Sequence, residues 1–164
     1  MLKEKFRELE ELLLSEIEVF YGERLVSVVV FGSAARETQS FESDLDILII
    51  AEGLPQGRMR RIREFNSVEE RVGPFLKSLQ QKEGINTYIS ALIKSPEEAQ
   101  KGSPLFLDMV EDAKILFDKG GFFQGILERL REKLGKLGAK RVWKGNAWYW
   151  DLKPDYKFGD LIEL

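Results

Sequence analysis

Two apolar runs separated by a short polar stretch constrain the fold of this chain most strongly. The first run, Val28–Phe31, is rich in β-branched residues, and the second, Leu45–Ile50, is almost continuously apolar. Runs of this kind are typical of strands that are covered on both faces. The segment therefore predicts a strand, a tight loop and a second strand. Its polar residues, at the exit of the first strand and the entry of the second, require a separate explanation.

Asp44 and Asp46 are the polar residues at the entry of the second strand. Side chains two positions apart on a strand point to the same face, so the two carboxylates lie side by side and repel each other. Such a pair beside apolar residues is costly unless a cation neutralises it or one carboxyl group is protonated. Mg²⁺ is commonly held by one or two carboxylates together with waters and substrate phosphates. The pair therefore predicts half of a Mg²⁺ site.

Gly32 and Ser33 follow the first strand and suggest the other half of the site. Glycine allows the backbone to approach a ligand closely, and Ser33 is suited to begin a short helix over residues 34–36. Backbone amides at a helix start bind phosphate groups. The Ser33 hydroxyl and the Arg36 guanidinium would donate further hydrogen bonds to phosphate oxygens. We therefore expect a phosphate cradle opposite the carboxylate pair.

Within residues 26–50 the chain resembles the minimal nucleotidyltransferases of the DNA polymerase β superfamily, whose signature is Gly-Ser, a spacer and Asp-x-Asp. The later layout resembles small archaeal members. The matching residues are Gly32, Ser33, Arg36, Ser43, Asp44, Leu45 and Asp46. The resemblance implies Mg²⁺-dependent transfer of a nucleoside monophosphate from a nucleoside triphosphate, ATP being the expected donor, through two metal ions. It assigns Asp44 and Asp46 to catalysis and metal binding, and Gly32, Ser33, Arg36 and Ser43 to the nucleotide.

The chain departs from this family pattern at one position. Active members usually carry a third acidic residue on a neighbouring strand, and the expected strand here, residues 85–93, contains no acid. Glu83 precedes that strand, and Glu97 and Glu98 follow it. Any of the three could replace the missing carboxylate from a loop. However, Ser95 and Glu98 also form a capping-box pattern, which explains these residues by helix capping alone.

Composition excludes several classes of chemistry. The chain has no cysteine, so it forms no disulfide framework or thiolate metal site, and it has no histidine, so imidazole-based catalysis and histidine-bound zinc are excluded. With 25 basic and 28 acidic residues the net charge is −3. This balance argues against extended DNA binding, which depends on a basic surface.

The length and the amino terminus predict one nucleotidyltransferase-like domain over residues 1–164. The chain is charged from Lys3 onward and has no long apolar span, so we expect no signal peptide, no membrane helix and a cytoplasmic protein.

The remaining pattern predicts helices around a small sheet. An amphipathic helix opens the chain and ends at Gly22, and a second begins at Arg58 and breaks or kinks at Gly73–Pro74. Further helices are expected after Ser95, over Leu105–Val110 and from Phe123 to Leu137. With strands at 26–31, 45–50, 85–93 and 114–117, the fold class is α/β (α+β): a small mixed sheet flanked by helices, resembling the polymerase β palm.

Several polar and aromatic clusters have two interpretations. The four arginines within residues 58–63 either face the triphosphate or an acceptor, or form a solvated helix face. Asp108, Glu111 and Asp112 are interpreted as the polar face of a buried helix. The aromatic-rich segment 139–164 contains all three tryptophans; it packs on the domain, stacks a nucleobase or anchors a partner.

Three functions are compatible with these observations. The first is a nucleotidyltransferase acting on an unknown acceptor, which is a protein, an RNA or a small molecule. The second is an antitoxin-like module that binds a small helical protein, with or without modifying it. The third is a nucleotide-binding domain that has lost transfer activity together with the third carboxylate.

Overall fold

The computed structural model describes residues 1–164 and is built on a four-stranded mixed sheet. The strands are β1 Leu25–Phe31, β2 Leu45–Ala51, β3 Ile89–Lys94 and β4 Lys114–Asp118, arranged in the order β3–β2–β1–β4. β1 pairs antiparallel with β2 and β4, whereas β2 and β3 are parallel. The predicted mixed sheet with flanking helices is confirmed.

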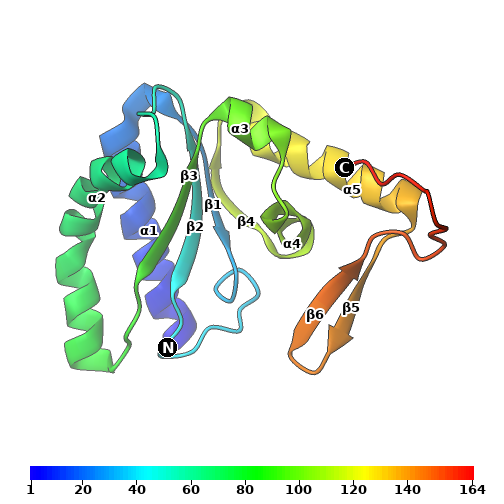
Figure 1. Ribbon diagram of the computed structural model, residues 1–164. Coiled ribbons are helices and arrows are strands. Elements are labelled where there is room, and N and C mark those ends of the chain that lie inside the picture. The colour runs from blue at the N-terminus through cyan, green and yellow to red at the C-terminus, as the bar shows by residue number, and fades with distance from the viewer.

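Helices cover both faces of this sheet (Figure 1). On one face lie α1 Leu2–Tyr21 and α2 Arg58–Ser78; on the other lie α4 Leu105–Asp112 and α5 Phe122–Leu137; the short α3 Pro96–Lys101 follows β3. Short helical turns span Gly22–Arg24, Leu79–Glu83 and Lys119–Gly121. None of these helices has the length and apolarity needed to cross a membrane.

The alternation of side chains along β2 explains its nearly continuous apolar sequence. Ile47 and Ile49 are buried in the core under α1 and α2, whereas Leu48 and Ile50 are buried in the second core under α4 and α5. Both faces of the strand are therefore removed from water, as the sequence predicts. Asp46 belongs by the same alternation to the α4 and α5 face.

Two predicted helix boundaries are confirmed. α1 ends at Tyr21, and Gly22 follows in a left-handed conformation, φ +57°. At the start of α3, the Glu98 amide donates to the Ser95 hydroxyl at 3.2 Å and the Ser95 amide donates to the Glu98 carboxylate at 2.8 Å. This reciprocal pair is the predicted capping box.

Of the break or kink expected at Gly73–Pro74, the break is wrong, because α2 runs through Pro74 to Ser78. A proline inside a helix removes one amide donor and leaves the carbonyl four residues earlier, that of Glu70, without a helical partner. Pro74 lies on the exposed side of α2, where water can bond to that carbonyl. The loss of one hydrogen bond is therefore tolerated.

Two other local predictions need correction. Residues 32–37 form turns in place of the short helix expected after Ser33. One amide of this stretch, that of Arg36, makes the bond of an α-helix, to the Gly32 carbonyl at 3.2 Å. The third strand begins at Ile89, not at Ile85. The residues before it bond to the loop leading into β2, with the Asn86 amide donating to the Phe41 carbonyl at 2.7 Å.

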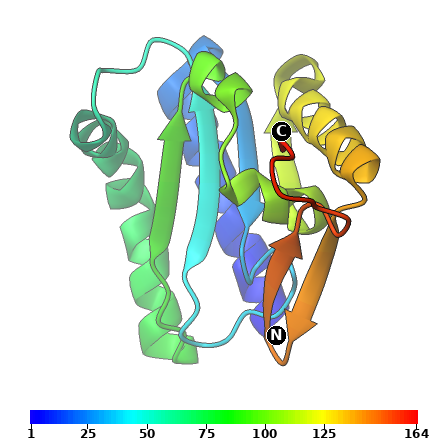
Figure 2. The same cartoon turned by 45° about the vertical axis from the view of Figure 1, so that its right-hand side comes forward.

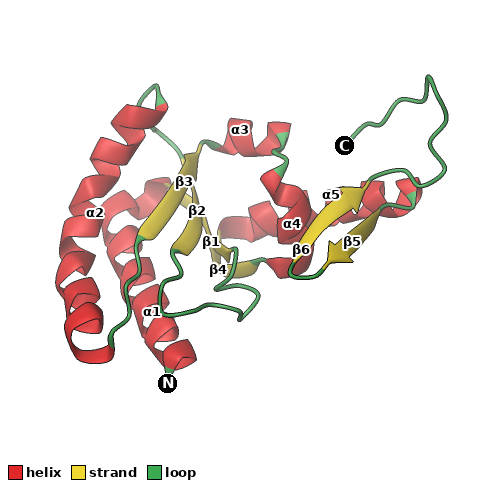
Figure 3. Ribbon diagram, turned by 60° about the horizontal axis from the view of Figure 1, so that its bottom comes forward, coloured by secondary structure: helices red, strands yellow, loops and turns green.

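The carboxyl-terminal aromatic segment forms a β-hairpin that the sequence analysis did not predict. β5 Lys140–Lys144 and β6 Ala147–Asp151 pair antiparallel around Gly145 and Asn146. Gly145 adopts φ +62°, as tight hairpin turns require. Figures 2 and 3 show this hairpin leaving the end of α5 and lying near α4, apart from the main sheet.

Candidate functional site

A cavity of about 190 Å³ lies between the end of β1, the start of β2 and helix α4. Its lining combines apolar and charged residues: Phe31, Gly32, Arg36, Asp46, Leu105, Asp108, Met109 and Asp112. Three of the residues predicted to form the site, Gly32, Arg36 and Asp46, therefore meet around one cavity. The strand register explains this meeting, because Phe31 is the direct partner of Asp46 across β1 and β2.

Gly32 and Asp46 are in direct contact. Gly32 has φ +72°, and a Cβ atom built on it would lie 2.2 Å from Asp46 Oδ2. A side chain at this position would therefore displace the carboxylate, and the left-handed backbone would be strained as well. The glycine is needed here both for the turn and for the close approach of the Asp46 carboxylate to the backbone.

The pKa of Asp46 is raised above its ordinary value. Burial is the largest cause, and the negative charge of Asp44 raises the pKa further. A hydrogen bond with Ser90 and the positive charge of Arg36 lower the pKa, but less than the other two effects raise it. The protein itself therefore stabilises the charged form of Asp46 only in part, which is compatible with a cation site.

Arg36 lies beside this cavity and contacts the carboxyl-terminal hairpin. Its guanidinium carbon is 4.6 Å from the ring centre of Trp148, within the range of a cation–π interaction. The side chain is half-buried. A flexible arginine is thereby held at the cavity by a residue more than a hundred positions away in the sequence.

Asp44, Ser33 and Ser43 do not line the cavity. Asp44 is exposed one residue before β2 and influences the site through its charge on Asp46. The Ser43 hydroxyl accepts a hydrogen bond from the Ser40 amide at 2.7 Å, and the Ser33 carbonyl accepts one from the Thr38 amide at 2.9 Å. In this structure both serines make contacts that shape the loop between the strands.

No acidic residue on β3 joins Asp44 and Asp46. Ser90 on β3 is the register partner of Asp46, so a hydroxyl stands where a neighbouring strand would present an acid. Glu98 is engaged elsewhere, because its carboxylate accepts a hydrogen bond from Arg61 at 2.6 Å. The hydrogen bond from the Ser95 amide lowers the pKa of Glu98 most, and together with the smaller effect of Arg61 it brings the pKa to about 2. No group of three or more acidic residues is arranged to hold a metal ion.

The structure adds two acidic residues to the site that the sequence analysis assigned only to the polar face of a helix. Asp108 and Asp112 lie one turn apart on α4 and both line the cavity. Leu105, Asp108, Met109 and Asp112 follow the spacing of one helix face, and this periodicity was the signal available in the sequence. The periodicity did not indicate which other segment of the chain would pack against this face.

The hairpin binds both of these acids. The indole nitrogens of Trp148 and Trp150 donate to the same oxygen of Asp108 at 2.6 and 2.9 Å. Arg141 forms an ion pair with Asp112, and both side chains are largely buried. The hairpin is thus attached by charge-assisted hydrogen bonds to two residues of α4 that line the cavity.

The residues at the cavity fit a divalent cation. Asp46 offers a carboxylate that burial and Asp44 leave poorly stabilised, and Ser90 offers a neighbouring hydroxyl oxygen. Mg²⁺ requires only one or two protein carboxylates when phosphate and water oxygens complete its coordination. Asp108 and Asp112 are already bound by the hairpin, so Asp44 and Asp46 are the carboxylates that suit a cation bound together with a nucleotide.

Comparisons with known proteins agree with this geometry. Residues 12–117 match the family model described as "Nucleotidyltransferase domain". A protein of Methanocaldococcus jannaschii, provisionally named protein adenylyltransferase MJ1305, is 31% identical over 144 residues, which cover 87% of this chain and 86% of the relative. The match includes both strands that carry the predicted site.

Solved structures with a similar fold were also found. Spectinomycin adenyltransferase AAD(9) from Enterococcus faecialis, with ATP and spectinomycin, has a TM-score of 0.50 at 13% identity, over 80% of this chain and 66% of that one. A toxin–antitoxin structure with AMP-PNP has a TM-score of 0.40 at 14% identity, over 84% and 94% of the two chains. At this identity the first likeness concerns the fold alone.

Proposed function

The chain belongs to the nucleotidyltransferase domain family, and from this premise we propose that it transfers a nucleoside monophosphate from ATP to a hydroxyl group of a protein, in a Mg²⁺-dependent reaction. The observation that carries the proposal is the contact between Asp46 and Gly32 at a cavity that Arg36 also lines. At this cavity the Asp46 carboxylate, the turn at Gly32 and the Arg36 guanidinium lie together, and these are the groups that triphosphate binding requires.

In this proposal Asp44 and Asp46 hold Mg²⁺, which when bound supplies charge neutralisation for the phosphate oxygens. Arg36 donates hydrogen bonds to the same phosphates, and its stacking on Trp148 keeps it extended toward them. The turn at Gly32 and Ser33 brings backbone amides near the phosphate chain. Ser43 is assigned to the nucleotide by the family resemblance alone.

The choice of ATP and of a protein acceptor rests on the Methanocaldococcus jannaschii relative, whose name describes a protein adenylyltransferase. A small helical protein, the partner suggested by the sequence resemblance, is the first acceptor to test. An RNA or a small-molecule acceptor would use the same phosphate and metal site, so these acceptors belong in the same experiment.

A nucleotide-binding domain without transfer activity is the second candidate. It is favoured by one observation, namely that Ser90 occupies the register position beside Asp46 where a third carboxylate would be expected. A serine hydroxyl is a weak proton acceptor compared with a carboxylate, so the acceptor hydroxyl would be activated poorly.

The test uses ATP labelled at the α-phosphate, Mg²⁺ and the purified protein, incubated with a host lysate, with host RNA and with a panel of hydroxyl-bearing small molecules. We expect label to appear on protein together with release of pyrophosphate. The Asp44→Asn, Asp46→Asn double variant is the matched control and should give neither signal. Transfer to protein by that variant would refute the site. Tight ATP binding without transfer to any acceptor would favour the second candidate.

A further inference from the structure

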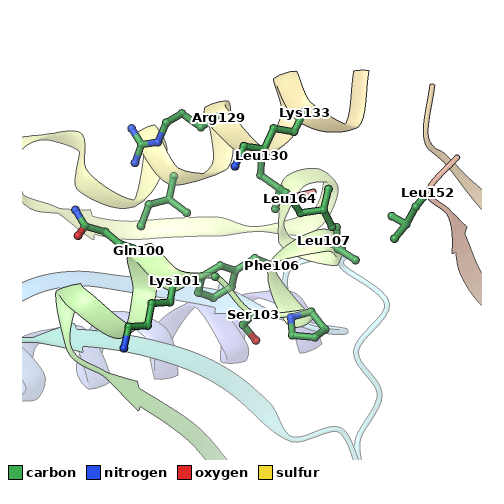
Figure 4. Close-up of a pocket in the computed structure, with 13 residues that line it drawn as sticks. Gln100, Lys101, Ser103, Phe106, Leu107, Arg129, Leu130, Lys133, Leu152 and Leu164 are labelled. Atoms are coloured by element: carbon green, nitrogen blue, oxygen red, sulfur yellow. The ribbon is translucent and has the colours of Figure 1, made fainter. Parts of the chain in front are cut away.

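A second cavity lies against the face of α4 opposite to the one that lines the candidate active site. Figure 4 shows the residues that line it. It has a volume of about 500 Å³, within the usual range for small-molecule sites. It lies between α5 and the segment running from α3 into α4, and Leu152 and Leu164 stand at one end of it. No residue lines both cavities, so this second cavity is separate from the proposed nucleotide site.

Apolar side chains from three parts of the chain line this cavity. Phe106 and Leu107 come from α4, Ile126 and Leu130 from α5, and Leu152 follows the hairpin. Phe106 and Ile126 belong to the second hydrophobic core, and the three leucines pack against that core. The floor of the cavity is therefore apolar, and a ligand that covers it is stabilised by the removal of this surface from water.

Three cations surround this apolar floor. Arg129 and Lys133 are one turn apart on α5, and Lys101 ends α3 on the opposite side of the cavity (Figure 4). None of the three takes part in an ion pair, and no carboxylate side chain lines the cavity. Among the lining side chains the charge is therefore only positive, in a chain whose net charge is −3. Three like charges around one cavity repel each other, and a bound anion would relieve that repulsion.

We propose that this cavity binds an amphipathic anion, a small molecule whose hydrocarbon body lies on Phe106, Leu107 and Leu130 and whose carboxylate or phosphate group lies between Arg129 and Lys133. The apolar floor provides affinity and the cations provide selectivity for the charged group, which is the usual division of roles in ligand sites. Lys101 lines the cavity on the side away from α5 and adds a third positive charge.

This proposal is independent of the proposed transfer reaction, because the two cavities share no lining residue. The Asp44→Asn, Asp46→Asn variant should therefore bind the amphipathic anion as the wild type does. Failure of one proposal would leave the other standing.

The experiment titrates decanoate and decyl phosphate into the full chain by calorimetry, below their micellar concentrations, with 1-decanol and decyltrimethylammonium as neutral and cationic probes. We expect saturable binding of an anion, at least about tenfold tighter than binding of the alcohol, and none of the cation. Preference for the carboxylate or the phosphate then distinguishes the two head groups. Equal binding of anion and alcohol, or no binding of either anion, would overturn the proposal.

Two variants separate the cationic rim from the apolar floor. Arg129→Gln, Lys133→Gln should reduce anion affinity about tenfold and leave binding of the alcohol unchanged, whereas Leu130→Gln should weaken both. The matched control is Lys77→Gln, Lys82→Gln, which removes two exposed charges near the end of α2. Thermal unfolding confirms that each variant is folded. Unchanged anion affinity in the Arg129 and Lys133 variant, or an equal loss in the control, would contradict the proposal.

Discussion

The guanidinium carbon of Arg36, in the loop after β1, lies 4.6 Å from the ring centre of Trp148 in the carboxyl-terminal hairpin. The hairpin is itself anchored to α4, since Trp148 and Trp150 donate to one oxygen of Asp108. A segment outside the matched family region therefore fixes the position of the arginine at the candidate active site. The hairpin is a structural part of that site.

Replacing Trp148 tests this dependence. Trp148→Ala should weaken Mg²⁺–ATP binding by about threefold to tenfold, because Arg36 loses the surface that holds it, whereas Trp148→Phe should retain most of the affinity. Tyr149→Ala is the control, since Tyr149 is exposed on the same strand. The measurement is the dissociation constant of ATP by calorimetry. Equal losses in the Trp148→Ala and Tyr149→Ala variants would show that Trp148 has no specific role.

Gly32→Ala, compared with a control glycine, distinguishes the cost of backbone strain from the loss of Mg²⁺–ATP binding. The substitution should cost about 1–2 kcal/mol of stability for the left-handed backbone and should also displace the Asp46 carboxylate, abolishing Mg²⁺–ATP binding. Gly84→Ala is matched, because Gly84 has φ +68° and open space around its Cβ position. The control should lose similar stability, measured by urea unfolding, and retain nucleotide binding. Normal binding by Gly32→Ala would contradict the close contact.

The raised pKa of Asp46 predicts a distinctive dependence of stability on pH. Its protonated form is favoured by folding, so the stability it contributes is fully present below the ordinary value of 3.8 and is lost as pH rises through the raised folded value. Without Mg²⁺, Asp46→Asn should therefore be more stable than wild type at neutral pH, and the difference should shrink on acidification.

The measurement is the melting temperature across pH 3–8, with Glu18→Gln on the exposed face of α1 as the control. Millimolar Mg²⁺ should raise the melting temperature of wild type at neutral pH but not that of Asp46→Asn. Parallel pH profiles for the wild type and Asp46→Asn would contradict the raised pKa.

Glu98 predicts the opposite pH dependence. Its hydrogen bond from the Ser95 amide, with a smaller contribution from Arg61, holds the pKa of Glu98 at about 2, so the stability it contributes is present above the ordinary value of 4.5 and is lost as pH falls toward 2. Glu98→Gln should cost roughly 0.5–1 kcal/mol at neutral pH, a value reduced by partial solvent screening. Glu97→Gln, on the exposed neighbour, should cost almost nothing. Urea unfolding at pH 7 and pH 3 measures both. A retained nucleotide affinity in Glu98→Gln would confirm that Glu98 is a structural residue.

Much of the fold could be predicted from local sequence. β1 and β2 could be predicted because apolar, β-branched runs of this length are typical of buried strands. The start of α3 could be predicted because Ser95 and Glu98 have the spacing of a capping box. The parallel pairing of β2 with β3 has no such local signal. The continuation of α2 through Pro74 could not be predicted, because it depends on whether water reaches the Glu70 carbonyl. The local sequence does not show that exposure.

The proximity of three candidate site residues could be predicted for the same reason. Gly32, Arg36 and Asp46 lie within one strand–loop–strand unit, so alternation and loop length bring them together. Asp108 was assigned to a polar helix face because its partners, Trp148 and Trp150, are about forty residues away. The hairpin that connects them depends on contacts between distant segments, and its sequence indicated only that aromatic residues gather there.

The most direct test of the account is calorimetric titration of ATP into the protein with and without Mg²⁺, alongside the Asp44→Asn, Asp46→Asn double variant. The wild type should bind ATP only when Mg²⁺ is present, and the variant should show no metal-dependent binding. Binding that is identical in the two proteins, or independent of Mg²⁺ in the wild type, would contradict the assignment of these carboxylates to a metal–nucleotide site.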